Sequence, residues 1–320
     1  MGSLLKSYWK WGRNMNIDID NRINKINDFN IEDEVTRYVP KKLTLKEMIV
    51  NVLRHILLIF VSIITFFPFI WMISSALKTK EEIFNFPPKL FPDSAQWGNF
   101  INVFNDAPFE VYLFNSFFVA TIEVAFQIVS SAMIAYALTQ LRFRGKKLLF
   151  AIIMGMYMLP SAVTYVPCYM LLSDFNLIDT FRGLIVSNLV NIFGIFLVRQ
   201  AFLQIDKGLI EAARIDGASH WKILWRIIFP LTKPTFITLG LINFVTYYNE
   251  YMYPSLITKS PEKFLVSAGL RQFFIEGGAY GIKWPEIMAA STITVLPLLI
   301  LFVIAQKWFM QGVNDTGVKG

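Results

Sequence analysis

The sequence predicts an all-α membrane protein with six transmembrane helices and a cytoplasmic loop between the fourth and fifth. Its composition is the first reason: 55% of the 320 residues are hydrophobic and 16% aromatic, but only 17% are charged. A soluble domain has about 25% charged residues. The second reason is that several apolar stretches reach the roughly 20 residues that a helix needs to cross a bilayer. Backbone groups in lipid must bond to one another, so helices are expected.

Six such stretches follow one another along the chain. They cover approximately residues 51–76, 113–138, 148–171, 183–203, 234–257 and 287–309. Pro160 and Pro167 are expected to bend the third stretch, because proline lacks the backbone donor of a regular helix. The residues before the first stretch are polar and lack the short apolar core of a signal peptide, so the first stretch is expected to remain as an anchor.

The cations predict the orientation. Most of the 30 Lys and Arg residues lie in the N-terminal segment, in the connections after the second and fourth helices, and in the C-terminal tail. Cationic connections stay in the cytoplasm, so both termini are expected there. We interpret the net charge of +7 as a sign of topology and expect no nucleic-acid partner.

Three regions follow from these boundaries. Residues 1–49 are expected to form a cytoplasmic, partly helical N-terminal extension, and residues 50–309 the six-helix transmembrane domain, which includes the cytoplasmic loop 204–233. Residues 310–320 form a cytoplasmic C-terminal tail. Between the helices, the outer connections 77–112 and 258–286 are interpreted either as simple connectors or as a docking surface for an outside partner.

Enzymatic chemistry has little support in the residues. The chain has one cysteine, Cys168, and two distant histidines, His55 and His220, so a disulfide framework or a Cys- or His-based metal site is not expected. The phosphate-loop pattern G-x-x-x-x-G-K-[ST] is absent from the sequence. We therefore predict no catalytic residues, no metal and no cofactor bound by this chain.

The cytoplasmic loop contains EAARIDGASHWKILWRIIFP, residues 211–230. Asp206 is expected to cap a helix that ends near Asp216, and Gly217 to adopt the left-handed conformation after it. Ser219 is expected to cap a second amphipathic helix, which Pro230 would stop. This helical hairpin admits three interpretations: a hairpin lying on the lipid surface, a DNA-reading helix-turn-helix, or a rigid lever that inserts into a cytoplasmic partner.

This segment resembles the EAA loop of permease subunits of ATP-binding-cassette importers. The motif positions are Glu211, Ala212, Ala213, Gly217, Ile227 and Pro230, and Phe229 stands where the family usually has Leu. YYNEYMYP, in the fifth helix, is similar to the Asn-Glu-Phe/Tyr stretch of sugar permeases, and the C-terminus resembles the family tail. Over about residues 45–320 the chain is similar to the MalG-like subunits of carbohydrate importers, the inner membrane components of binding-protein-dependent transport systems.

The resemblance implies the partners and the coupling residues. A second, homologous permease would complete a heterodimer, two ATPase subunits would hold ATP and Mg, and an extracellular binding protein would deliver a sugar. The chain would lie in the inner or plasma membrane of a prokaryote as a multi-pass protein. The ATPase-coupling residues would be Glu211, Ala212, Ala213, Asp216, Gly217, Ile227 and Pro230.

Two acids lie within predicted spans, Glu123 and Glu250. Charges at such depth usually face the bundle interior or an aqueous path. A substrate pathway is therefore predicted from Glu123, Tyr247, Tyr248, Asn249, Glu250 and Tyr251. The alternative is an interfacial tyrosine belt beside a structural acid. Asn188 and Asn191 are expected to form interhelical hydrogen bonds.

The sequence thus predicts the permease subunit of an ATP-driven importer of an oligosaccharide or a related sugar, with hydrolysis in a partner subunit. One alternative is a secondary transporter coupled to ions through Glu123 or Glu250. The others are a permease of the same family for a non-sugar solute, and a membrane scaffold that only recruits a cytoplasmic partner.

Overall fold

The computed structural model describes residues 44–276 and 283–317, with side chains up to 272 and over 283–307. Every regular element in these ranges is helical, which confirms the predicted all-α class. The expected extension over 1–49 lies outside the described residues except for its last six. The chain divides into two units, residues 1–66 and 67–320.

The first long helix, α3 (Leu45–Ala76), starts in the first unit and ends in the second. Its N-terminus is a capping box, in which Glu47 N donates to Thr44 Oγ1 (3.3 Å) and Thr44 N donates to Glu47 Oε2 (2.7 Å). Its apolar side chains within the first unit are exposed, as expected for a helix solvated by lipid or covered by another subunit.

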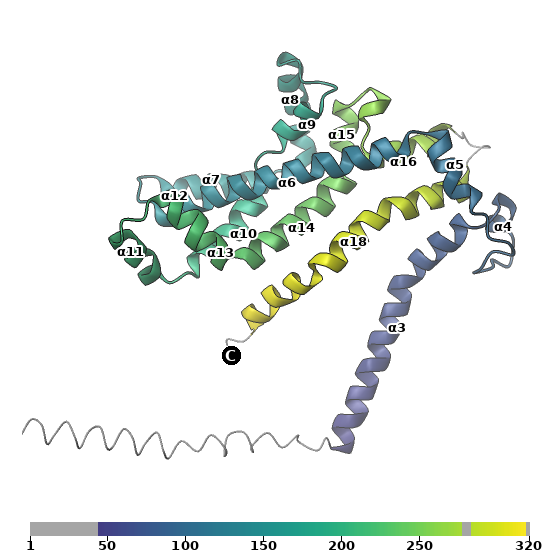
Figure 1. Ribbon diagram of the computed structural model, residues 1–320, viewed down its shortest axis with the longest axis horizontal. Helices are drawn as coiled ribbons and strands as arrows, with labels where there is room; N and C mark the ends of the chain where they lie inside the picture. Colours follow the sequence, from purple (N-terminus) through teal and green to yellow (C-terminus); the bar gives the residue numbers. More distant parts are fainter. Residues whose placement is uncertain (1–43, 277–282, 318–320) are drawn as a thin grey trace, which may run out of the picture. The chain divides into compact units, whose positions relative to one another are not determined.

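The second unit is built around α6 (Phe109–Gln140), which contacts α10 (Ile192–Leu203) and α14 (Lys233–Asn249) along its length (Figure 1). The C-terminal helix α18 (Trp284–Gly317) packs against α14. Close approach of α10 to α6 requires Gly194, because an added Cβ there would lie 2.6 Å from Ser131 Oγ. Small residues at helix crossings are typical of membrane bundles.

Three predicted spans are interrupted. The third divides into α7 (Lys146–Tyr157) and α8 (Ser161–Asp174), bent by 100° at Pro160, whereas Pro167 remains inside α8. The fourth divides by 45° into α9 (Phe181–Ser187) and α10. The fifth ends in a separate short helix, α15 (Met252–Ile257).

Length and composition allow up to six membrane spans among the described residues. Three are single helices and three are bent pairs, the last of which joins His220–Leu231 to Lys233–Asn249 across an 80° bend. The fifth candidate span therefore starts earlier than the predicted 234–257, because the helical hairpin of the cytoplasmic loop runs almost directly into α14. Likewise α18 continues through the predicted tail to Gly317.

The connection after α3 is ordered by its own polar contacts. It contains α4 (Lys80–Phe84) and α5 (Gly98–Asp106). Lys78 is 1% exposed, donates to Lys89 O (2.5 Å) and lies over the Trp71 ring at 4.4 Å. Burial lowers the pKa of Lys78. The later connection contains a 3₁₀ turn (Pro261–Lys263) and α16 (Val266–Glu276).

Candidate functional site

The cytoplasmic loop begins with the capping contacts that its sequence predicts. Asp206 Oδ1 accepts from Gly208 N (2.9 Å) at the start of α11 (Lys207–Ile215). Gly217 has φ +76°, in the left-handed region that glycine adopts without a steric penalty. Ser219 Oγ then accepts from Lys222 N (3.3 Å) and caps α12 (His220–Ile223). These contacts confirm a tight helical hairpin.

The second helix of the loop ends at Leu231, one residue beyond Pro230, where it was expected to stop. From α12 the helix continues through a π-helical turn (Leu224–Ile228) into α13 (Phe229–Leu231), and Thr232 is its C-cap residue. Phe229 N donates to Leu224 O, five residues back. Pro230 lies directly after this wider turn, and only Leu231 follows it in the helix.

The loop is attached to the C-terminal end of α6. Ile210, Ile223, Leu224 and Ile228 are buried in one cluster with Ala132, Ala135 and Tyr136 of α6. Two polar contacts reinforce it: Tyr136 Oη and His220 Nδ1 lie 2.8 Å apart, and Arg214 Nη2 donates to Gln140 O (3.2 Å). A displacement of the loop therefore acts directly on α6.

The predicted coupling residues lie mostly on the outside of this loop. Exposed members are Glu211, Ala212, Asp216, Gly217 and Pro230, and half-buried members are Ala213 and Ile227. Glu211 also lines a cavity of about 300 Å³ together with Arg142, Lys146, Lys207 and Arg214. Most motif residues are thus accessible, and Ile215 and Trp221, which lie between them, are exposed as well.

A second, larger cavity of about 510 Å³ lies among α8, α9, α14 and α15. Its lining is rich in hydroxyl groups and consists of Ser161, Thr164, Tyr165, Cys168, Ser187, Asn188, Thr246, Tyr247, Glu250 and Tyr253. The Tyr165 and Tyr253 rings lie 5.3 Å apart at 40°. Hydroxyls, an amide, a carboxylate and aromatic faces are the groups that suit a polyhydroxylated ligand.

A chain of buried amides supports the cavity from α6. Asn188 Nδ2 donates to Glu123 Oε1 (3.0 Å), and Gln127 Nε2 donates to Asn188 O (2.6 Å). Asn243 Nδ2 in turn donates to Gln127 Oε1 (2.7 Å). Glu123 is only 2% exposed, and such groups stay buried only when they are hydrogen-bonded. The contacts of Asn188 confirm its predicted interhelical role.

The structure separates the predicted pathway residues. Tyr247 and Glu250 line the cavity, and Glu123 lies behind Asn188. Tyr248 is fully buried and donates to Thr294 O (3.1 Å), whereas Asn249 is exposed and donates to Val245 O (2.8 Å). Asn191 Nδ2 bonds to Tyr247 Oη (3.3 Å), as expected of an interhelical amide.

The lining residues of α8 and α9 carry no signal in the sequence. Ser161, Thr164 and Ser187 are ordinary hydroxyl residues in apolar stretches. Ser161 and Thr164 line the cavity because α8 turns away from α7 at Pro160, whereas Ser187 reaches it from the end of α9. Only the predicted proline bend indicated that this segment departs from a straight span.

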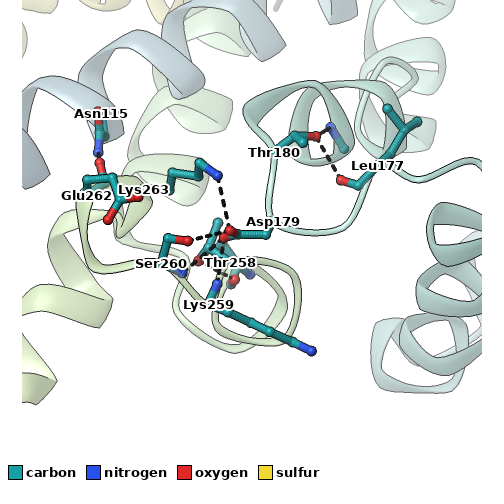
Figure 2. A network of polar contacts seen from close by, with 11 residues as sticks. Asn115, Leu177, Asp179, Thr180, Thr258, Lys259, Ser260, Glu262 and Lys263 are labelled. Carbon is teal, nitrogen blue, oxygen red and sulfur yellow. Dashed lines mark hydrogen bonds and ion pairs between the residues drawn. The ribbon is translucent and has the colours of Figure 1, made fainter.

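Asp179 joins the connection between α8 and α9 to the segment after α15 (Figure 2). Its carboxylate accepts from Lys259 N (2.9 Å), Ser260 N (3.0 Å), Ser260 Oγ (2.5 Å) and Lys263 Nζ (3.0 Å). These donors, Ser260 Oγ foremost, hold the pKa of Asp179 well below its usual range. These hydrogen bonds therefore link the connection between α8 and α9 to the segment after α15, and all three helices contribute residues to the cavity.

Comparison with known proteins gives a consistent family. The family described as "Binding-protein-dependent transport system inner membrane component" matches residues 127–315. The sn-glycerol-3-phosphate transport system permease protein UgpE of Yersinia enterocolitica is 31% identical over 83% of this chain and 96% of its own length. The arabinooligosaccharides transport system permease protein AraQ of Halalkalibacterium halodurans is 27% identical over 82% and 94%.

A solved structure supports the fold. The crystal structure of a bacterial ABC transporter involved in the import of the acidic polysaccharide alginate includes a chain that superposes with a TM-score of 0.73. The two chains are 23% identical, and the match covers 83% of this chain and 98% of the other. The helical arrangement described above is therefore the fold of that chain.

Proposed function

The chain belongs to the family of binding-protein-dependent transport system inner membrane components, and we propose that it forms half of the pathway of an ATP-driven carbohydrate importer. As a permease subunit it is a transporter component and not an enzyme. The names of its relatives include a phosphorylated polyol, an arabinooligosaccharide and an acidic polysaccharide, so a sugar or sugar-like substrate is the class they share.

The observation that carries the proposal is the connection between cavity and loop through one helix. Tyr136 and Gln140, at one end of α6, contact the cytoplasmic loop. Glu123 and Gln127, near the middle of the same helix, contact Asn188 at the hydroxyl-rich cavity. A helix of 32 residues is about 48 Å long, which matches the thickness of a bilayer with its headgroups.

The partners follow from the family and from the surfaces that the chain exposes. Dependence on a binding protein is part of the family description. The exposed EAA residues on the loop, Glu211 and Gly217 among them, suit a seat in a separate ATPase subunit that holds ATP and Mg. A second, homologous permease would cover the other side of the cavity, so that the substrate crosses between two chains.

Reconstitution tests this function. The transporter, with its partner permease, ATPase and binding protein, is placed in vesicles whose ion gradients are collapsed. ATP-dependent uptake of saccharide supports the proposal, whereas uptake that needs a gradient would favour an ion-coupled carrier. No flux at all would leave only the role of a scaffold.

The Glu211→Lys and Gly217→Asp variants test the coupling loop within the same assay. We expect each variant to insert normally but to lose uptake and substrate-stimulated ATP hydrolysis, because a new charge or a strained turn disturbs the surface that meets the ATPase. The control is Lys147→Glu, an exposed charge reversal in the first turn of α7. Normal transport by both loop variants would exclude this role.

A further inference from the structure

The relatives transport solutes of different charge, and the cavity itself distinguishes between them. We infer that the cavity among α8, α9, α14 and α15 selects an uncharged saccharide and disfavours one that carries carboxylate or phosphate groups. This inference rests on the proposed function, because it concerns the substrate of that same pathway. The names of the relatives include both charged and uncharged solutes, so family membership by itself does not decide between the two classes.

The charge of the lining is the first observation. Among the described residues that line the cavity, Glu250 is the only Asp or Glu, and none is Lys, Arg or His. Glu123, the acid behind the cavity, is bonded to Asn188. A phosphate or carboxylate ligand is normally held by Arg or Lys in paired hydrogen bonds. Here an anion would find no such cation and would instead lie beside an acidic side chain.

The N-terminus of α8 does not reverse this balance. Ser161 and Thr164, in the first turn of α8, line the cavity, and a helix N-terminus carries a partial positive charge of about +0.5. Glu250 lines the same cavity as this helix end. A partial charge of this size does not replace the paired donors of an Arg or Lys side chain, so the lining still lacks a full cation for an anionic ligand.

The hydrogen-bonding capacity of Glu250 is the second observation. Glu250 is half-buried and follows the last residue of α14. Among the described residues, no side chain donates a hydrogen bond to its carboxylate. Two oxygens are thus available to accept from a ligand, and sugar hydroxyls are donors that suit them. The Tyr165 and Tyr253 rings add apolar faces beside this acceptor.

Cys168 allows the sign of the cavity to be measured directly. It is the only cysteine of the chain, lines the cavity and lies with its Sγ 3.0 Å from Tyr253 Oη. Methanethiosulfonates of equal size carrying an aminoethyl or a sulfonatoethyl group are applied to the assembled transporter. Mass spectrometry of the Cys168 peptide gives the two rates without interference from cysteines of the partner subunits.

We expect the cationic reagent to react at least about tenfold faster than the anionic one, after division by the ratio for a small free thiol, because a cleft of one sign concentrates counter-ions. Glu250→Gln should remove most of this preference. Glu110→Gln, at an exposed position of α6, should leave it unchanged. If Cys168 reacts slowly, Thr164→Cys in a Cys168→Ser chain reports on the same cavity from an exposed position. Equal rates, or faster reaction of the anion, would overturn the inference.

Uptake by the reconstituted transporter completes the test. The probes are arabinooligosaccharides as the uncharged class, and alginate oligosaccharides and sn-glycerol 3-phosphate as the anionic class. ATP-dependent uptake restricted to the uncharged class supports the inference. Uptake restricted to the anions would overturn the inference and leave the proposed function intact. A transporter whose cavity shows the expected reagent preference but moves no saccharide with ATP would instead overturn the proposed function.

Discussion

Several hydrogen bonds converge on the side chain of Asp179, which lies between α8 and α9. It has φ +57°, a conformation that Asp and Asn tolerate better than other non-glycine residues. Its carboxylate accepts four hydrogen bonds from Lys259, Ser260 and Lys263 (Figure 2). Asp179→Asn therefore removes the charge without changing the backbone preference.

We predict that Asp179→Asn lowers the stability of the chain in detergent by about 1–3 kcal/mol, the range for hydrogen bonds to a charged group. The native pKa of Asp179 is lowered, so its contribution is complete above the unfolded pKa of about 3.9. The difference between the two proteins should thus be constant from about pH 5 to 8 and should shrink below about pH 4. Thermal unfolding across this range measures it, and Asp174→Asn, an exposed neighbour, is the control.

At the same scale, the residues around the cavity show which lining side chains can be predicted from the sequence and which cannot. Glu250 and Tyr247 were predictable, because an acid beside tyrosines inside an apolar stretch needs a polar environment. Tyr248 has the same neighbours but is buried against α18, where it donates to Thr294 O. Only the rotation of α14 in the bundle distinguishes Tyr247 from Tyr248.

At the scale of elements, α16 packs against α6 through a glycine. A Cβ added to Gly269 would overlap the Tyr112 ring, and Tyr112 is only 3% exposed. We predict that Gly269→Ala costs about 1–3 kcal/mol by overpacking, seen as a lower melting temperature in detergent. Gly155→Ala is the matched control, since nothing lies within 4 Å of its added Cβ in α7. Equal melting temperatures would contradict the close packing.

The contact between the cytoplasmic loop and α6 gives a prediction about coupling. Tyr136→Phe removes the hydroxyl that lies 2.8 Å from His220 Nδ1 while keeping the ring in its apolar cluster. We expect fewer sugar molecules imported per ATP hydrolysed, by a factor of about 2 to 13, because one hydrogen bond stabilises by about 0.5–1.5 kcal/mol. The ratio of flux to hydrolysis is the measurement, and Tyr157→Phe, at an exposed tyrosine of α7, should not change it.

For the whole molecule, the distribution of cations predicts which ends of the helices face the cytoplasm. In a Cys168→Ser background, a cysteine at Asp93, in the connection after α3, should react with a membrane-impermeant maleimide on intact cells. A cysteine at Arg144, between α6 and α7, should react only after the cells are opened. Both positions are exposed, so accessibility in the protein is matched. The reverse pattern would contradict the orientation and place the coupling loop outside.

The sequence by itself determined the class, the approximate spans and the local form of the cytoplasmic loop. These properties depend on short-range physics: apolar length against bilayer thickness, the caps at Asp206 and Ser219, and the left-handed turn at Gly217. The expected end of the second loop helix at Pro230 also lies within one residue of the observed end at Leu231.

Tertiary structure alone decided which side chains meet. The 100° bend between α7 and α8 brings Ser161 and Thr164 to the same cavity as Glu250, although they lie far apart in the chain. Asp179 and Ser260 also lie far apart in the chain, and the tertiary structure brings them into contact. Such contacts depend on the angles at which helices break and on their rotation about their axes, and neither is encoded in a pattern of apolar residues, because a span in lipid is apolar on nearly every side.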